Sequence, residues 1–217
     1  MAPVSRFWEK DEVNVDDPAE QMGDLLDIET VRPTVAQQTT MLVMARQAID
    51  AALNNRRPAT LVPRDPFFDR KAGVFVTLRE AQGERSSGPG FLRGCIGHVQ
   101  ADRMLRQVVP DMAIQAATAD PRFSPMSPEE VDQVRIEIAI LSPSRLINSK
   151  DEIEIGKHGL MLTGDWRRAL LLPKSPVLYG WDLDEYLANL HQKAGLPVGY
   201  WPKRGQLFAF TSFDFGE

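Results

Sequence analysis

The stretch Phe91-Leu92-Arg93-Gly94-Cys95-Ile96-Gly97-His98 holds more chemically active groups per residue than any other part of this chain. It contains the only cysteine of the sequence, with Gly94 directly before it and Gly97 two residues after it. Glycine lets backbone amides approach a ligand because it has no Cβ. A nearby cation such as Arg93 favours the nucleophilic thiolate of Cys95 over the thiol. The pattern is therefore typical of a reactive or anion-binding corner at the end of a strand.

A plainer interpretation of the same stretch stays open, in which Cys95 is a small buried hydrophobic residue of a strand. His98 is a candidate base for the thiol. Residues three apart on a strand face opposite sides, so that role requires a turn at Gly97.

The flanking segments place the stretch on a hairpin. Residues 73–78 are rich in β-branched and aromatic side chains, which predicts a strand. Residues 81–90 are rich in glycine and serine and predict a long turn. Residues 92–96 then return as the partner strand, so we expect Cys95 on the second arm of the hairpin, near its exit.

Helical spacing of apolar residues predicts a helix from Asp102 to Asp120, with Asp102 as its N-cap. Pro110 lies inside this pattern and should bend the helix without ending it. The helix should end at Asp120-Pro121-Arg122.

Further helices are expected after Thr34, after Ser127 and after Asp182, each a candidate N-cap. Alternation predicts a half-buried strand over 135–141, and other strands are expected at 169–172 and 206–215. The tryptophans Trp166, Trp181 and Trp201 are expected in core or rim packing. Strands outnumber helices and pair mostly through hairpins, which indicates an α+β fold with helices packed on antiparallel sheet.

Three groups of residues are expected to meet near Cys95: its own strand with Arg93 and His98, the Asp120-Pro121-Arg122 corner, and Lys157-His158. Two arginines would form a cationic pocket for a carboxylate or phosphate. The alternative for the corner is structural, with Asp120 accepting backbone amides. The predicted catalytic residues are Cys95, Arg93, Arg122 and His158, and the predicted binding residues are Gly94, Gly97, His98, Asp120 and Lys157.

A metal site made from His98, His158, His191 and Cys95 is a weaker alternative, because no pair has a recognised ligand spacing. We therefore expect neither a metal nor a cofactor, and a small anionic ligand instead.

Residues 1–33 are strongly acidic and show little apolar periodicity, which predicts a flexible arm preceding one domain over 34–217. Docking of the arm through Phe7, Trp8 or the patch Leu25-Leu26-Asp27-Ile28 is the alternative. The 217 residues carry a net charge of −5 and no basic stripe, which argues against nucleic-acid binding. No apolar run is long enough for a bilayer, and a single cysteine favours the cytoplasm.

The same octapeptide carries a family resemblance. Leu92-Arg93-Gly94-Cys95-Ile96-Gly97 resembles the signature of the AMMECR domain, whose prokaryotic members are called AmmeMemoRadiSam system protein A. Asp120-Pro121-Arg122-Phe123 resembles a second signature of that family. Later blocks follow in the same order over roughly 34–217, namely Gly156-Lys157-His158-Gly159-Leu160, Trp181-Asp182 and Lys193-Ala194-Gly195-Leu196-Pro197.

The resemblance implies two closely packed α+β subdomains of unequal size. It also implies that the protein acts together with a Memo-like protein and a radical SAM protein. It implies no particular reaction. Two hypotheses follow for the chain: a cysteine-dependent enzyme or enzyme subunit, or a non-catalytic interaction module whose Gly-Cys corner is structural. A homodimer is compatible with either.

Overall fold

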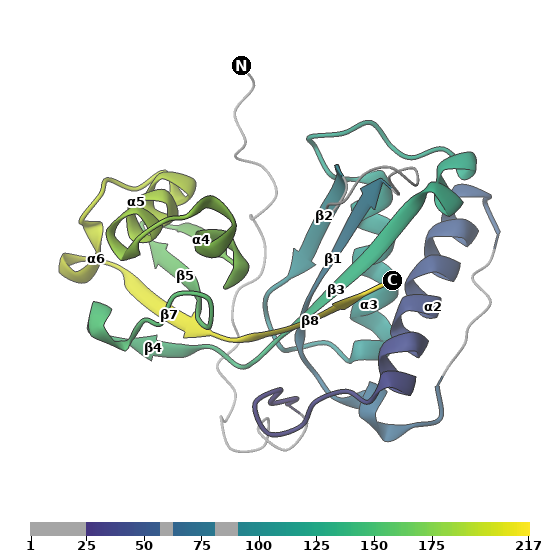
Figure 1. Ribbon diagram of the computed structural model, residues 1–217, viewed down its shortest axis with the longest axis horizontal. Coiled ribbons are helices and arrows are strands. Elements are labelled where there is room, and N and C mark those ends of the chain that lie inside the picture. The colour runs from purple at the N-terminus through teal and green to yellow at the C-terminus, as the bar shows by residue number, and fades with distance from the viewer. Residues whose placement is uncertain (1–24, 57–62, 81–90) are drawn as a thin grey trace.

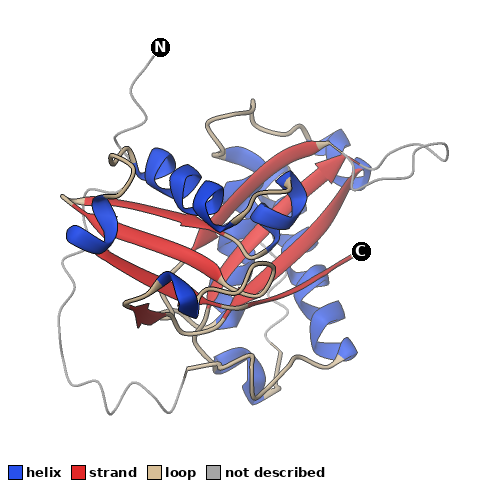
Figure 2. Cartoon of the chain, turned by 60° about the vertical axis from the view of Figure 1, so that its left-hand side comes forward, coloured by secondary structure: helices blue, strands red, loops and turns tan. Residues whose placement is uncertain are grey.

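The structure is a computed structural model that describes residues 25–56, 63–80 and 91–217. These residues form two lobes, connected by two neighbouring chain crossings (Figure 1). Each lobe contains one antiparallel four-stranded sheet with helices packed beside it, as Figure 2 shows. The predicted α+β class is therefore confirmed.

The first lobe is built on a sheet of strand order β2-β1-β3-β8. Its strands are β1 (Gly73–Glu80), β2 (Leu92–His98), β3 (Val134–Leu141) and β8 (Ser212–Gly216). Its helices are α2 (Val35–Leu53), α3 (Leu105–Thr118) and the 3-10 turns η2 (Pro66–Asp69) and η3 (Pro128–Gln133). α2 and α3 cover one face of the sheet, where alternate residues of β1 and β3 such as Val76 and Ile138 are fully buried.

The second lobe is built on a sheet of strand order β4-β7-β5-β6. Its strands are β4 (Arg145–Ile147), β5 (Gly159–Gly164), β6 (Arg167–Leu171) and β7 (Gln206–Phe210). Its helices are α4 (Lys174–Tyr179), α5 (Leu183–Ala194), α6 (Tyr200–Lys203) and the 3-10 turn η4 (Lys150–Glu152). The core of this lobe lies between the sheet and α5, around Tyr186 and Leu190.

The chain crosses between the lobes at Ser142 and at Thr211. The Ser142 N–H donates to the Thr211 carbonyl at 3.0 Å, and the Thr211 N–H donates to Ser142 Oγ at 2.9 Å. The predicted single strand over 206–215 is therefore wrong: it is β7 and β8, which belong to different sheets. The Thr211 amide is bound by a serine side chain instead of a neighbouring strand, and the ladder ends there.

The second face of the first sheet packs against the second lobe. Phe75 of β1 and Leu141 of β3 contact Met161, Leu170 and Phe210 in one apolar cluster. Side chains on this face of β1 and β2 therefore lie at the junction of the two lobes.

The predicted helix starts at Thr34, Ser127 and Asp182 are confirmed. All three residues form capping boxes with the side chain of the third helical residue. α3 passes through Pro110 as one helix, as predicted. Its N-cap is Met104 and not Asp102, whose carboxylate pairs with His98 instead.

Part of the segment that the sequence assigned to a flexible arm is built into the first lobe. Leu26 and Ile28 are buried in its core, and the Leu26 N–H donates to the Lys71 carbonyl at 2.9 Å. The docking alternative therefore describes this patch, whereas Phe7 and Trp8 lie outside the described residues.

The three tryptophans have different environments. Trp201 is buried, and Trp181 stacks on Tyr179 with ring centroids 4.8 Å apart. Trp166 is fully exposed at the turn between β5 and β6, so the expectation of packing is wrong for it. Within the described ranges, no helix is both long enough and apolar enough to cross a membrane.

Candidate functional site

The two glycines that flank Cys95 are explained by close packing. Gly94 lies against α3, where an added Cβ would be 2.1 Å from the Ala116 carbonyl oxygen. At Gly97 an added Cβ would be 2.2 Å from the ring of Phe75. Both positions therefore require glycine because a neighbour occupies the space, which differs from the expected ligand-binding role.

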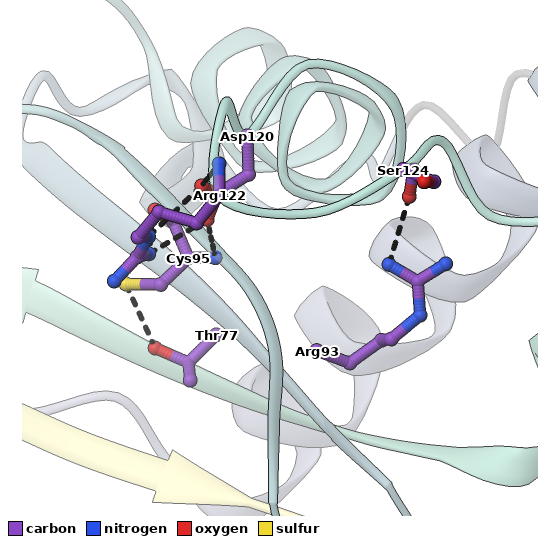
Figure 3. Close-up of polar contacts among 6 residues, drawn as sticks. All are labelled: Thr77, Arg93, Cys95, Asp120, Arg122 and Ser124. Atoms are coloured by element: carbon purple, nitrogen blue, oxygen red, sulfur yellow. Dashed lines mark hydrogen bonds and ion pairs between the residues drawn. The ribbon is translucent and has the colours of Figure 1, made fainter. Parts of the chain in front are cut away.

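Cys95 is half-buried on the face of β2 that lies at the junction of the lobes. It pairs across the ladder with Thr77, whose buried hydroxyl donates to the cysteine Sγ at 3.3 Å. The Cys95 N–H donates to Asp120 Oδ2 at 2.8 Å (Figure 3). Both the sulfur and the backbone of this residue are thus held by specific polar contacts.

Asp120 is the buried carboxylate that organises the site, with 4% of its surface exposed. Besides Cys95 it accepts hydrogen bonds from Arg122, at 3.1 Å from the backbone N–H, 2.9 Å from Nε and 2.6 Å from Nη2. Burial alone would raise the pKa of the Asp120 carboxyl. The hydrogen bonds from Arg122 and Cys95 outweigh that effect, so its pKa is lowered.

Arg122 is thereby fixed beside the thiol, as Figure 3 shows. Its Nη2 donates to the Cys95 carbonyl at 3.3 Å, and its guanidinium also interacts with the Cys95 side chain. The hydrogen bond to Asp120 raises the pKa of Arg122, although burial opposes the shift, so the guanidinium is a permanent cation here. Its side chain is 53% exposed and therefore accessible to a ligand.

Lys193 of α5 brings a second cation to the site from the other lobe, and sequence reasoning missed it. Its Nζ donates to the Leu170 carbonyl at 2.9 Å and interacts electrostatically with Cys95 and Arg122. Burial of the ammonium lowers the pKa of Lys193; the cysteine opposes this shift and Arg122 adds to it. The one signal in the sequence was its place in the Lys-Ala-Gly-Leu-Pro block, because a lysine in the last turn of a helix is otherwise ordinary.

Arg93 is predicted to join Arg122, but the structure keeps them apart. The Arg93 Nε donates to Glu130 Oε1 at 2.7 Å, and its Nη1 donates to the Ser124 carbonyl at 3.0 Å. Figure 3 shows its side chain directed away from Cys95. The bond to Glu130 ties β2 to η3, and only 12% of the Arg93 side chain is exposed.

The histidines are likewise distributed over separate places. His98 contacts Asp102 at 2.5 Å, and β2 continues as regular strand to His98 without the turn that would bring it to the sulfur. His158 is in the second lobe, where its Nδ1 accepts the Glu154 N–H at 3.0 Å.

The neighbouring Lys157 pairs with Glu154 at 3.0 Å. His191 is buried, with Nδ1 at 2.7 Å from the Leu187 carbonyl and Nε2 accepting the Trp201 N–H at 3.2 Å. In the portion of the chain that the structure describes, no three His, Cys, Asp or Glu side chains gather to hold a metal ion.

The structure therefore brings together Cys95, Asp120 and Arg122 of the predicted set, and adds Thr77 and Lys193. This arrangement presents a half-buried sulfur with a hydroxyl donor and two cations around it. Arginine with lysine suits a carboxylate or phosphate.

Comparison with known proteins places this site in a family. The AMMECR1 family model matches residues 42–215, which include all five residues of the site. The chain belongs to the AMMECR1 family. This AMMECR1 protein is 36% identical over 191 residues to a protein of Methanocaldococcus jannaschii, covering 85% of this chain and 92% of that one. It is 37% identical over 186 residues to a protein of Methanothermobacter thermautotrophicus, covering 82% and 93%.

The AMMECR1 fold is also seen in a solved structure. The crystal structure of an uncharacterized protein from Pyrococcus horikoshii superposes with a TM-score of 0.75 at 34% identity, covering 82% of this chain and 90% of that chain. The similarity therefore extends over both lobes and the junction between them.

Proposed function

We propose that this AMMECR1 protein is a cysteine-dependent enzyme, or an enzyme subunit, that acts on a small anionic substrate at the junction of its lobes. The observation that carries the proposal is the Asp120–Arg122 pair, which fixes a guanidinium beside a half-buried thiol. Cys95 is the nucleophile, and Arg122 with Lys193 binds the anionic group of the substrate.

The proposed step is substitution at an electrophilic carbon. The Cys95 thiol first loses its proton to solvent. The sulfur–carbon bond then forms while the bond to the leaving group breaks, and the leaving group keeps the bonding electron pair. Lys193 donates a proton to that group and regains one from solvent. Its lowered pKa makes it a stronger acid than a free lysine.

The contribution of both lobes supports an enzyme over a purely structural corner. Arg122 and Cys95 come from the first lobe and Lys193 from the second, so the cation pair forms only when the lobes pack together. Asp120 also accepts the backbone N–H groups of Cys95 and Arg122, as the structural alternative predicts, so the feature that favours an enzyme is the partly exposed guanidinium beside the thiol.

The partners that we propose are a Memo-like protein and a radical SAM protein, and the support for them is the family resemblance. A surface suited to docking is present on α4, where Val177, Leu178 and Tyr179 are exposed. The same surface is the observation that favours the second candidate function, a non-catalytic interaction module. That candidate would leave the thiol without a role.

A thermal-shift screen with acetate, succinate and inorganic phosphate tests substrate binding. An anion that binds at 100 times its Kd stabilises the fold by about 2.7 kcal/mol, which for a chain of this length raises Tm by roughly 5–11 °C. We expect at least one of these anions to stabilise the wild type and Arg93→Gln, but not Arg122→Gln or Lys193→Gln. Equal stabilisation of all four proteins, or of none, would favour the interaction module.

A further inference from the structure

A second candidate binding site is the cavity beside the two chain crossings. It has a volume of about 150 Å³, and its walls come from the N-terminal segment, the β3–β4 crossing, the start of β5 and the β7–β8 crossing. Its lining residues include Asp27, Glu29, Arg145, His158 and Thr211. No residue of the Cys95 site lines it, so it is a separate site.

One polar atom in the wall is buried and lacks a partner among the described residues. The Thr211 Oγ1 atom is buried and makes no hydrogen bond. His158 is 9% exposed, and its Nδ1 accepts the Glu154 N–H, so a neutral ring carries its proton on Nε2. The His158 Nε2–H is therefore a further donor of a residue that lines the cavity. A buried polar atom without a partner, such as Thr211 Oγ1, is rare in folded proteins and requires an explanation.

The charges of the wall are of both signs. Arg145 supplies a guanidinium whose Nη1 is bound to Glu152 at 2.9 Å, which leaves its other donors. Asp27 and Glu29 supply carboxylates from the N-terminal segment. Burial, Arg145 and Lys157 lower the pKa of His158, whereas Glu154 and Glu29 oppose that shift, so the ring is neutral at neutral pH.

The donors and carboxylates of the wall together indicate which class of ligand fits the cavity. Arg145, the His158 Nε2–H and the Thr211 hydroxyl are donors for a carboxylate, while Asp27 and Glu29 are acceptors for an ammonium group. A volume of about 150 Å³ is below the roughly 300–1,000 Å³ of pockets for drug-sized ligands. We propose that the cavity binds a small zwitterion of the amino-acid class, with its carboxylate on the Arg145, His158 and Thr211 side and its ammonium on the Asp27 and Glu29 side.

The site does not depend on the chemistry of Cys95. Its walls include both crossings between the lobes, Ser142–Pro143 and Phe210–Thr211, together with the segment that Leu26 anchors in the first lobe. A ligand that bridges these walls would bind the folded chain and not the unfolded one, and would therefore raise its Tm.

Isothermal titration calorimetry on the full chain tests the proposal with L-serine as the zwitterion. Acetate probes the carboxylate half of the site, and ethanolamine probes the ammonium half. We expect L-serine to bind saturably and each half to bind at least tenfold more weakly, because one charged contact is lost. The ¹⁵Nε2 resonance of His158 should shift on titration with L-serine. Absence of saturable binding, or acetate binding as tightly as L-serine, would overturn the proposal.

Three variants and one control sharpen the result. Glu29→Gln and Thr211→Val should each weaken L-serine binding at least fivefold, while Glu80→Gln, an exposed acid of β1 outside the cavity, should not. Thr211→Val should not lower the stability of the free protein, because it removes a hydroxyl that has no partner. Cys95→Ala should bind L-serine normally, which separates this site from the proposed enzyme function. Unchanged affinity in both Glu29→Gln and Thr211→Val would refute the assigned walls.

Discussion

Replacement of Asp120 by asparagine removes the charge that connects the thiol strand to Arg122. The carboxylate accepts four hydrogen bonds, one from Cys95 and three from Arg122. An asparagine keeps one oxygen and so loses about half of them. Hydrogen bonds to charged groups are worth about 1.5–3 kcal/mol each. Because the Arg122 side chain is 53% exposed and can be hydrated, we expect the lower end, a loss of about 3 kcal/mol.

The pH dependence gives this prediction a second check. The pKa of Asp120 is lowered in the folded protein, against about 3.9 for an unfolded chain. A carboxyl with a lowered pKa stabilises the fold at all pH values above its unfolded pKa, and the contribution is lost as the pH falls through the folded pKa. The difference between wild type and Asp120→Asn should therefore be complete at neutral pH and shrink below about pH 4.

Urea unfolding of both proteins at neutral and acidic pH measures the effect. A loss of about 3 kcal/mol corresponds to a Tm decrease of roughly 6–12 °C for a chain of this length. Asp184→Asn is the matched control, because its carboxylate pairs with Lys150 at 3.2 Å but its side chain is 81% exposed, and should cost less than about 1 kcal/mol. Equal costs for the two variants, or a cost for Asp120→Asn that is the same at every pH, would refute the reasoning.

Other changes test the packing around the site. Leu26→Ala should lower the free energy of unfolding by about 3 kcal/mol, because this side chain is fully buried, whereas exposed Val35→Ala should cost under about 0.5 kcal/mol. Gly94→Ala should cost at least about 2 kcal/mol, because its Cβ would overlap a carbonyl of α3. Urea denaturation measures the free energy of unfolding of all three variants. If Leu26→Ala costs as little as Val35→Ala, residues 25–28 belong to a loosely attached arm and not to the core of the first lobe.

The sequence predicted elements whose signals are local. Capping boxes at Thr34 and Asp182 depend on residues three positions apart, and the apolar stripe through Pro110 shows the continuity of α3 without reference to the rest of the fold. The end of β7 just before Thr211 has no such local signal. It depends on the contact with Ser142, 69 positions earlier in the chain.

The residues of the candidate site likewise divide into those that local sequence predicts and those that depend on long-range contacts. Alternation along a regular strand would put Arg93 and Cys95 on one face of β2, so their proximity was a fair expectation from the sequence, but the β1–β2 ladder shifts its register at Leu78 and Arg79 and skips Arg93. The long arginine side chain instead reaches Glu130, 37 positions away, and that partner decides its direction. Lys193 lies on another lobe, and only the packing of the lobes brings it to the thiol. Long-range contacts thus determine which cations of the sequence serve Cys95.

The alkylation rate of Cys95 with iodoacetamide, measured as a function of pH, tests the central claim most directly. We expect the folded wild type to react faster at neutral pH than the urea-unfolded protein, whose thiol is mostly protonated. Arg122→Gln and Lys193→Gln should each slow this reaction, while Arg93→Gln, the matched control, should react like the wild type. A rate that is slow, flat with pH and unaffected by Arg122→Gln and Lys193→Gln would contradict the activated thiol and leave the interaction module as the better account.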